Sequence, residues 1–373
     1  MNVPYLDLPA QIRSIRPALD AAIARTLDTC SFCLGPDVVQ FEKAFAAYVG
    51  SKHCIGFNSG TSALHVAMRI LDVGPGDEVI TTPFTFIATS WAIDYVGAKP
   101  VYVDIDEQTM NLDVRLLEKA ITTRTKAVMP VHLFGHPFDV DPVLEICRRH
   151  GLPLVEDAAQ AHGATYKGKT VGAFGVMSGF SFYPGKNLGA CGEGGALLTD
   201  RSDFAKRAAN LREHGSSVRY FHDEVGYNYR MEGIQGAVLS VKLKYLDAWN
   251  AARRLHAASY QKALGGVASV LAPKEMQYAR HVYHVYAVRT DGRERLMDKL
   301  AESGIACGVH YPVPIHMQHA YAGRCQGAGC FPVAERCARE FVSLPMFPEL
   351  TEEQIAYVGN ELGRHAKVPS GAR

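Results

Sequence analysis

The sequence of 373 residues predicts an α/β protein with a mainly parallel sheet in a large domain, followed by a smaller α+β domain. Between about residues 55 and 200, short runs rich in β-branched and aromatic residues alternate with longer helical stretches. Glycine or proline closes most of these units, as at Gly74, Pro75 and Gly97. This alternation is typical of parallel strands that are covered by helices on both faces.

Each element of the large domain follows from its own stretch of sequence. We expect strands at 79–81, 101–103, 127–131, 154–155 and 180–182. We expect helices between them at 62–71, 86–96, 114–120 and 141–150. In sheets of this kind, ligands gather at the carboxyl ends of the strands, so polar residues at those positions are the first candidates for a site.

The second domain is expected after a long connecting helix. Residues 235–264 carry apolar side chains such as Val238, Leu246 and Trp249 among lysines and arginines, which predicts a helix. Beyond it, 283–288 alternates as a strand, and 293–303 and 352–362 are expected to be helical. We therefore divide the chain into a large domain, 1–249, and a small domain, 250–373. The N-terminal segment could pack on the small domain.

Composition excludes several functional classes. Lys and Arg total 39 against 38 acids, so the net charge of +1 favours neither a nucleic-acid partner nor an anionic membrane. No basic stretch followed by an apolar run begins the chain, and no apolar run is long enough to span a membrane. Nine cysteines without a secretion signal suggest reduced thiols and a cytoplasmic location. The pair Cys30 and Cys33 has no partner pair at zinc spacing, so no metal is expected.

Three segments carry candidate chemistry, and the first is the turn at Asn58. The run Asn-Ser-Gly-Thr-Ser-Ala-Leu leads from a strand into a helix, with Gly60 at the bend and the hydroxyls of Thr61 and Ser62 at the helix start. Free backbone N–H groups and hydroxyls at a helix N-terminus suit a phosphate. Serine and threonine also cap helices with no ligand present, so this segment alone does not decide between the two.

The second segment places Asp157 directly after an apolar strand. A carboxylate at this end of a parallel strand lies where ligands bind. It could instead cap a nearby backbone N–H group. The small residues Ala158 and Ala159 favour a ligand, because they leave room for a flat molecule against the backbone.

The third segment holds Lys186 in a glycine-rich loop after a strand of aromatic residues. An exposed loop lysine is the ordinary interpretation. A crowded or buried amine, however, loses its proton more easily and becomes a nucleophile toward an aldehyde. The three segments together would supply a phosphate site, an acid for a ring nitrogen and an imine-forming lysine. These are the groups that bind pyridoxal phosphate.

Six motifs in order now show a resemblance to the pyridoxal phosphate–dependent sugar aminotransferases of the DegT–DnrJ–StrS family, of fold type I. They are NSGTSAL, TFIAT, VEDAAQAHGA, SFYPGKNLGACGEGG, GYNYR and HYPVPIH. The resemblance implies that Lys186 carries the cofactor as a Schiff base and that Asp157 pairs with its ring nitrogen. Cys191 stands where some relatives have an aromatic residue.

The resemblance also implies the remaining contacts of the cofactor. Gln160 would meet its phenolic oxygen, and Phe86 would lie against its ring. Four residues would hold the phosphate, and a fifth would join them from a second subunit of a homodimer with shared sites. These residues are Gly60, Thr61, Ser62 and Ser181, with Asn228 from the second subunit.

The substrates implied are an amino-acid donor, L-glutamate, and a nucleotide-linked keto sugar. We expect amination at C3 of a 3-keto sugar, because the HYPVPIH segment is similar to a loop of C3-specific members. His310, Tyr311 and Tyr183 are expected to contact the sugar. Arg219 is either an ordinary surface charge or a group that binds the pyrophosphate. A C4 transferase on a 4-keto sugar and a non-catalytic sensor that binds the cofactor or a sugar nucleotide remain alternatives.

Overall fold

A single twisted sheet forms the centre of the larger part of the molecule in this computed structural model, which describes residues 1–324 and 327–366. Seven strands of the described chain lie in the order β3, β2, β4, β5, β8, β9 and β1. Isolated parallel bridges from Val128 to Leu154 and from Val131 to Asp157 join the two halves of this sheet. The strands are β1 (His53–Phe57), β2 (Glu78–Thr81), β3 (Lys99–Tyr102), β4 (Thr125–Val128), β5 (Val155–Asp157), β8 (Met177–Ser181) and β9 (Gly195–Thr199).

All of these strands are parallel except β9, which runs antiparallel to both β8 and β1. The mainly parallel sheet expected from the sequence is therefore confirmed. Strand β9 was not expected, because Thr199 is its only β-branched residue and the rest consists of glycine, alanine and leucine. It returns the chain directly from the Lys186 loop into the sheet.

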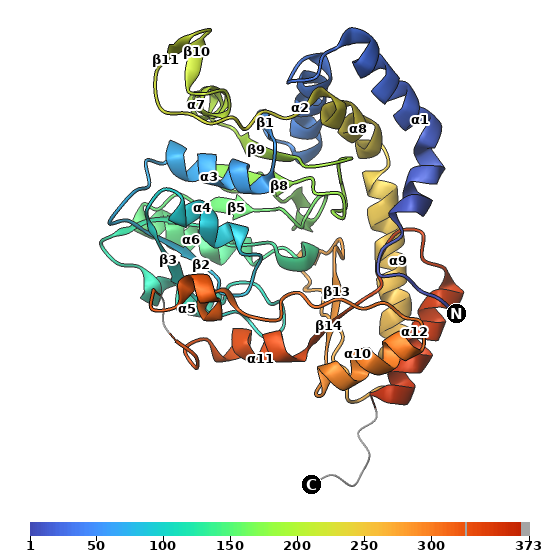
Figure 1. Cartoon of the computed structure of the whole chain (residues 1–373). Helices are drawn as coiled ribbons and strands as arrows, with labels where there is room; N and C mark the ends of the chain where they lie inside the picture. The colour runs from blue at the N-terminus through green and yellow to red at the C-terminus, as the bar shows by residue number, and fades with distance from the viewer. Residues whose placement is uncertain (325–326, 367–373) are drawn as a thin grey trace.

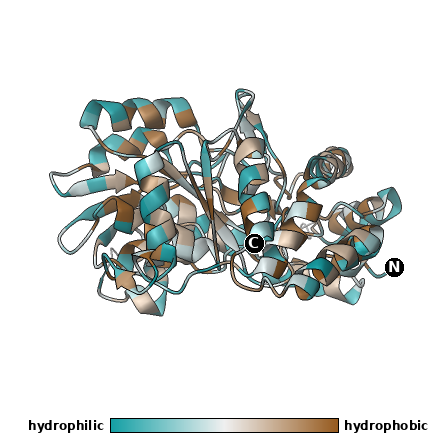
Figure 2. Cartoon of the chain, turned by 90° about the horizontal axis from the view of Figure 1, so that it is seen from above, coloured by the Kyte–Doolittle hydropathy of each residue, from teal (hydrophilic) through white to brown (hydrophobic). Residues whose placement is uncertain are grey.

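Helices cover both faces of the sheet (Figure 1). Alternate strand residues face opposite cores, as Val79 and Ala127 contact one cluster and Ile80 and Val128 another. Figure 2 shows hydrophilic and hydrophobic residues side by side on these helices, as expected when one face is buried. One face is covered by α3 (Gly60–Ile70), α4 (Ala88–Asp94) and α7 (Ser202–Arg212), and the other by α2 (Pro36–Val49), α5 (Val114–Leu117), α6 (Val140–His150) and α8 (Gly233–Leu243).

A second core lies beside the sheet and is built mainly from the C-terminal third of the chain. Helices α9 and α12 pack together, and β13 pairs antiparallel with β14 (Figure 1). Val3 also belongs to this core and forms a parallel bridge with Ile305. The elements are α9 (Leu246–Leu264), β13 (Tyr286–Arg289), α10 (Arg293–Glu302), α11 (Pro332–Glu340), β14 (Phe341–Leu344) and α12 (Glu352–His365). The division at residue 249 remains a prediction.

The expected single helix at 235–264 is wrong, because it consists of two helices. Helix α8 ends at Leu243 and α9 begins at Leu246. The intervening Lys244 and Tyr245 include no glycine or proline, so no local signal marked the break. The physical cause is packing: α8 lies against α1 (Leu8–Thr29) and α2, whereas α9 lies against α12.

Two shorter boundaries also differ from expectation. Helix α4 begins at Ala88 rather than at 86, which leaves Phe86 in the loop before it. Strand β13 begins at Tyr286 rather than at 283. No helix of the described chain combines the length and the apolarity that a membrane span requires.

Candidate active site

The N-terminus of α3 lies against the end of β8. Ser59 caps the helix, since its hydroxyl accepts a hydrogen bond of 3.0 Å from the Ser62 backbone N–H group. Within the described residues, the backbone N–H groups of Gly60 and Thr61 have no hydrogen-bond partner. A Cβ atom on Gly60 would lie 2.8 Å from the Cβ atom of Ser181. The close approach therefore requires glycine and brings Ser181 beside two free N–H donors.

Asp157 ends β5 at the carboxyl edge of the sheet, with a residue exposure of only 4%. Its Oδ2 atom accepts a hydrogen bond of 2.7 Å from the Thr89 hydroxyl, and its Oδ1 accepts one of 3.1 Å from the Ala159 N–H group. Burial raises the pKa of Asp157 above its ordinary value, and these hydrogen bonds and the Lys186 charge oppose the rise. A buried acid held in this way is suited to pair with a cationic ring nitrogen.

Gln160 connects the sheet edge to the C-terminal part of the chain. Its Oε1 atom accepts a hydrogen bond of 2.7 Å from the Phe134 N–H group, and its Nε2 donates one of 2.9 Å to the Tyr311 hydroxyl. The Tyr311 ring lies 6.0 Å from the ring of Phe86, centroid to centroid. Phe86 itself is 53% exposed, so part of its side chain is accessible to a ligand. Gln160, Tyr311 and Phe86 thus form one connected wall.

Lys186 lies in the loop after β8 and is half-buried. Its side-chain amine makes no hydrogen bond or ion pair with the residues that the structure describes. Burial lowers the pKa of Lys186 to about 8, although the Asp157 charge acts in the opposite direction. An amine with this pKa is neutral in about one molecule in ten at pH 7, far more often than an ordinary lysine, and the neutral form is the nucleophile.

The loop that carries Lys186 is anchored on both sides of the lysine. The Lys186 N–H group donates to the Tyr183 carbonyl at 2.8 Å. The Asn187 amide donates to the Asn250 side chain and to the Val282 carbonyl. Farther along, the buried Lys242 ammonium donates a hydrogen bond of 2.7 Å to the Gly189 carbonyl. These contacts come from α8, α9 and the C-terminal part, so the loop is held between the two cores.

Three histidines, His162, His284 and His310, are near enough to Lys186 for its charge to affect them, and sequence reasoning singled out only His310. Burial lowers the pKa of all three, to about 4 for His310 and to about 3 for His162, and the positive charge of Lys186 adds to this effect at each. The pKa of His284 lies well below its ordinary value. All three imidazoles are therefore neutral near pH 7. His284 could have been found because it follows Tyr283 in the expected strand 283–288, where a buried histidine is unusual.

Thr89 and Asn187 were also missed as site residues. Both lie inside motifs that were recognised, TFIAT and SFYPGKNLGACGEGG, but their side chains carry no charge that marks them out.

His310 is held by two neighbours. Its Nδ1 atom shares a hydrogen bond of 2.9 Å with the Ser343 hydroxyl, and its ring stacks on Tyr5. His316 lies apart from it and pairs with Glu335 at 3.1 Å.

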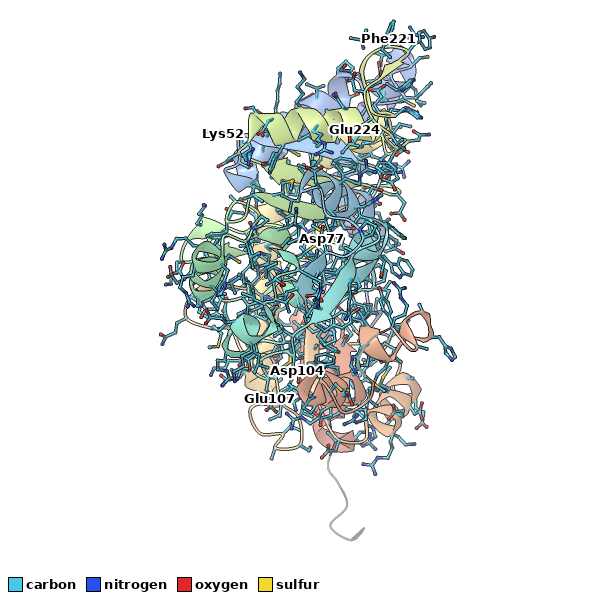
Figure 3. The ribbon with its side chains drawn as sticks, turned by 90° about the vertical axis from the view of Figure 1, so that its left-hand side faces the viewer. Lys52, Asp77, Asp104, Glu107, Phe221 and Glu224 are labelled. Carbon is cyan, nitrogen blue, oxygen red and sulfur yellow. The ribbon has the colours of Figure 1, made fainter. Side chains whose placement is uncertain are left out.

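The structure does not bring every predicted residue to this group. Asn228 is exposed, and no interaction within the described chain joins its side chain to Lys186 or Asp157. Arg219 stacks over Tyr220 at the turn between β10 (Ser216–Val218) and β11 (Phe221–His222). Figure 3 places this hairpin, labelled at Phe221, at one extremity of the molecule. Within one subunit, Arg219 therefore does not contact the lysine.

Tyr183 and the three cysteines singled out in the sequence, Cys30, Cys33 and Cys191, are all exposed. Tyr183 precedes Lys186 in the same loop and is 56% exposed, so its side chain is accessible to a ligand. Cys191 is exposed, and its N–H group donates to the Gln235 side chain at 2.9 Å. Cys30 and Cys33 are both free thiols on the surface.

The arrangement fits pyridoxal phosphate. Two unpartnered N–H groups at α3 can take a phosphate, the buried Asp157 can take a ring nitrogen, and the free amine of Lys186 can take an aldehyde. These three groups come from β1–α3, β5 and β8, whose ends meet at one edge of the sheet. Gln160, three residues after Asp157, joins this edge to Tyr311 and, through the Tyr311 ring, to Phe86.

Comparison with known proteins agrees with this geometry. Residues 13–363 match the model of the DegT/DnrJ/EryC1/StrS aminotransferase family. The chain is 46% identical to a pleiotropic regulatory protein of Geobacillus stearothermophilus, over 96% of this chain and 97% of that protein. It is 47% identical to the dTDP-3-amino-3,4,6-trideoxy-alpha-D-glucose transaminase of Streptomyces venezuelae, over 96% of this chain and 94% of that protein.

A solved structure agrees over the whole fold. The S. venezuelae protein DesV, crystallised in complex with a ketimine intermediate, superposes with a TM-score of 0.96 at 45% identity and covers 98% of this chain and 99% of its own. The fold expected from the motifs, fold type I, is thereby confirmed. The chain belongs to the DegT/DnrJ/EryC1/StrS aminotransferase family and is an aminotransferase whose cofactor is pyridoxal phosphate.

Proposed function

We propose that the protein transfers an amino group from an amino acid, L-glutamate, to C3 of a nucleotide-linked 3-keto sugar. The observation that carries this proposal is the position of the Lys186 amine, unbonded and easily deprotonated, near the buried Asp157 at one edge of the sheet. The Streptomyces relative, whose name specifies a 3-amino sugar nucleotide, supports the choice of C3.

The roles of the residues follow from their contacts. When bound, pyridoxal phosphate supplies an electrophilic carbon for the amino group and a ring that accepts electron density. The Lys186 amine is the nucleophile that holds this group, and Nζ then carries a proton to and from the reacting carbon. Asp157 keeps the ring nitrogen protonated through its charge, with Thr89 holding its Oδ2 atom. Gly60, Thr61, Ser62 and Ser181 bind the phosphate.

The wall beside Lys186 orients the sugar. Gln160 keeps the Tyr311 hydroxyl in place, and His310 is held by Ser343. Tyr183 and Phe86 are both more than half exposed and are available to a substrate. Fixing the acceptor in one orientation selects which carbon meets the reacting group, and this positioning contributes a large share of the rate of a bimolecular reaction.

We further propose that the active unit is a homodimer. No interaction within the described chain joins Asn228 or Arg219 to Lys186 or Asp157, and both residues are exposed in the segment that follows α7. The exposed apolar side chains of Val218, Tyr220 and Phe221 on this hairpin suit a partner surface. An isologous contact would bring both hairpins to opposite active sites.

A panel of nucleotide-linked 3-keto and 4-keto sugars, assayed for conversion of glutamate to 2-oxoglutarate, tests the function directly. We expect product only from 3-keto acceptors, with the amino group on C3 in the product's NMR spectrum. Turnover of 4-keto sugars alone would replace C3 by C4 and leave the aminotransferase intact. Binding of sugar nucleotides with no turnover of any acceptor would instead favour the sensor.

A further inference from the structure

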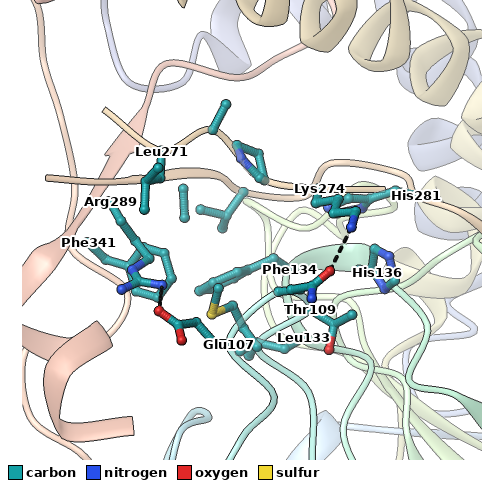
Figure 4. Close-up of a pocket in the computed structure, with 16 residues that line it drawn as sticks. Glu107, Thr109, Leu133, Phe134, His136, Leu271, Lys274, His281, Arg289 and Phe341 are labelled. Atoms are coloured by element: carbon teal, nitrogen blue, oxygen red, sulfur yellow. Dashed lines mark hydrogen bonds and ion pairs between the residues drawn. The ribbon is translucent and has the colours of Figure 1, made fainter. Parts of the chain in front are cut away.

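A cavity of about 230 Å³ lies between the two cores, apart from the site around Lys186 (Figure 4). Its walls are the loop 107–110, the turn η2 (Leu133–Gly135) after β4, the segment 271–274 and strand β13. Neither Lys186 nor Asp157 nor Gln160 lines it. The cavity therefore requires its own explanation.

The floor of the cavity is apolar. Leu133, Phe134, Val285, Ala287 and Phe341 line it, and each has a residue exposure of 5% or less. Water gains few hydrogen bonds on such a surface, so an apolar ligand body is favoured over solvent. Two aromatic rings on the floor, Phe134 and Phe341, lie edge to face with centroids 5.9 Å apart and offer a flat partner for a ring.

The polar side of the cavity carries one unbalanced positive charge. Arg289 donates to Glu107 at 3.0 Å and to Glu340 at 2.7 Å, and Arg336 also pairs with Glu107. These two arginines and two glutamates neutralise one another. Lys274 instead donates to the neutral amide of Gln108 at 2.6 Å, and it forms no ion pair with any described residue. Figure 4 shows Arg289 and Lys274 at opposite ends of the cavity.

The cavity floor is connected to the lysine site by one residue. The side chain of Phe134 lies on the floor, while its backbone N–H group donates to Gln160 Oε1 at 2.7 Å. Its carbonyl accepts a hydrogen bond of 2.9 Å from the His284 N–H group. A ligand that moves the Phe134 ring would therefore move the group that orients Gln160.

We propose that this cavity binds a small amphipathic monoanion, with its apolar body on the Phe134–Phe341 floor and its carboxylate at Lys274, and that occupancy is transmitted to Gln160 through Phe134. The binding part is independent of the reaction. The transmission part rests on the proposed contact of Gln160 with the cofactor.

Two matched probes test the binding part: 4-tert-butylbenzoate and its neutral analogue 4-tert-butylbenzamide. Met110 lines the cavity, so its methyl group, ¹³C-labelled and assigned with Met110→Leu, reports on binding by NMR. We expect the Met110 signal to shift on titration with the carboxylate and the amide to bind about tenfold more weakly, since a charge-assisted hydrogen bond is lost. Lys274→Gln should remove this tenfold difference, whereas Lys262→Gln, an exposed lysine on α9, should keep it.

The outcomes separate the two parts of the proposal. An unshifted Met110 signal at millimolar probe overturns the site, and equal affinity for carboxylate and amide overturns the role of Lys274. For transmission, we expect the carboxylate to shift the visible absorption of the cofactor-loaded wild type but not of Lys274→Gln at the same concentration. Binding at Met110 with an unchanged spectrum overturns transmission. Because the NMR measurement needs no turnover, failure of the proposed function leaves the binding test intact.

Discussion

The Thr89 hydroxyl donates a hydrogen bond of 2.7 Å to Oδ2 of Asp157, across 68 positions of sequence. Thr89 lies in the first turn of α4 and Asp157 at the end of β5, so the bond ties a covering helix to the edge of the sheet. It opposes the rise in the pKa of Asp157 that burial causes. The charge state of the acid thus depends on a neutral neighbour.

Replacing Thr89 by valine should shift the acid limb of the pH–rate profile to higher pH. The pKa of Asp157 is already raised, and loss of the hydrogen bond raises it further. As pH falls through that pKa, the carboxylate is protonated and no longer supports the ring nitrogen. Loss of a hydrogen bond to a charged group should raise the pKa of Asp157, and with it the acid limb of the profile, by about one pH unit or more. Profiles of kcat/KM for the loaded enzyme measure it, with Thr89→Ser as the conservative control. An unmoved acid limb in Thr89→Val would show that the hydroxyl does not act through the charge of Asp157.

The lowered pKa of Lys186 predicts how fast the cofactor-free protein captures pyridoxal phosphate. Only the neutral amine attacks an aldehyde, and with a pKa of about 8 its fraction rises steeply between pH 7 and 8 and levels off above pH 9. An ordinary lysine, with a pKa near 10.5, would give a rate that keeps rising past pH 9. Stopped-flow absorbance at several pH values distinguishes the two. Lys186→Ala should form no adduct and lose amino transfer; transfer at the native rate in that variant would remove Lys186 from the mechanism.

Gly60→Ala should weaken the binding of phosphate specifically. The added Cβ atom would lie 2.8 Å from Ser181 Cβ and 3.1 Å from the Phe180 carbonyl, so the start of α3 must shift. The dissociation constant for pyridoxal phosphate should rise by about tenfold or more, because each lost hydrogen bond to a charged group is worth more than 1 kcal/mol. Pyridoxal, which lacks the phosphate, should be affected less. Gly266→Ala, with nothing within 4 Å of the new Cβ atom, is the control. An equal loss for both ligands would indicate a general disturbance of the site.

The sequence was sufficient for the parallel sheet and for the residues that carry charge at its edge. Asp157 and Lys186 each follow an apolar strand, and in a parallel sheet that position alone predicts that the two converge. The turn at Gly60 was not decisive by itself, because serine and threonine also cap helices that bind no ligand; it became a phosphate candidate only together with Asp157 and Lys186. The three segments together indicated pyridoxal phosphate, and the resemblance of the six motifs to a known family supported the same cofactor.

What the sequence could not reveal depends on contacts between distant segments. No local pattern distinguishes Thr89 or Asn187 from other small polar residues, since their roles arise from partners 68 and 63 positions away. The break between α8 and α9 has the same origin, because each helix follows a different packing partner. The placement of Arg219 at a hairpin turn, remote from the lysine of its own subunit, likewise depends on tertiary structure.

Sharing of sites between two subunits can be tested by mixing inactive protomers. The backbone next to Asn228 is fixed, because the Asn58 N–H group donates to the Tyr229 carbonyl at 2.9 Å. The Asn228 residue itself is exposed. If it completes the partner's phosphate site, Lys186→Ala and Asn228→Asp homodimers should both be inactive. A heterodimer of the two would have one site with both substitutions and one with neither. Random mixing of equal amounts should then recover about one quarter of the wild-type activity. Heterodimers isolated with two different affinity tags and found inactive would contradict sharing, and active Asn228→Asp homodimers would remove Asn228 from the phosphate site.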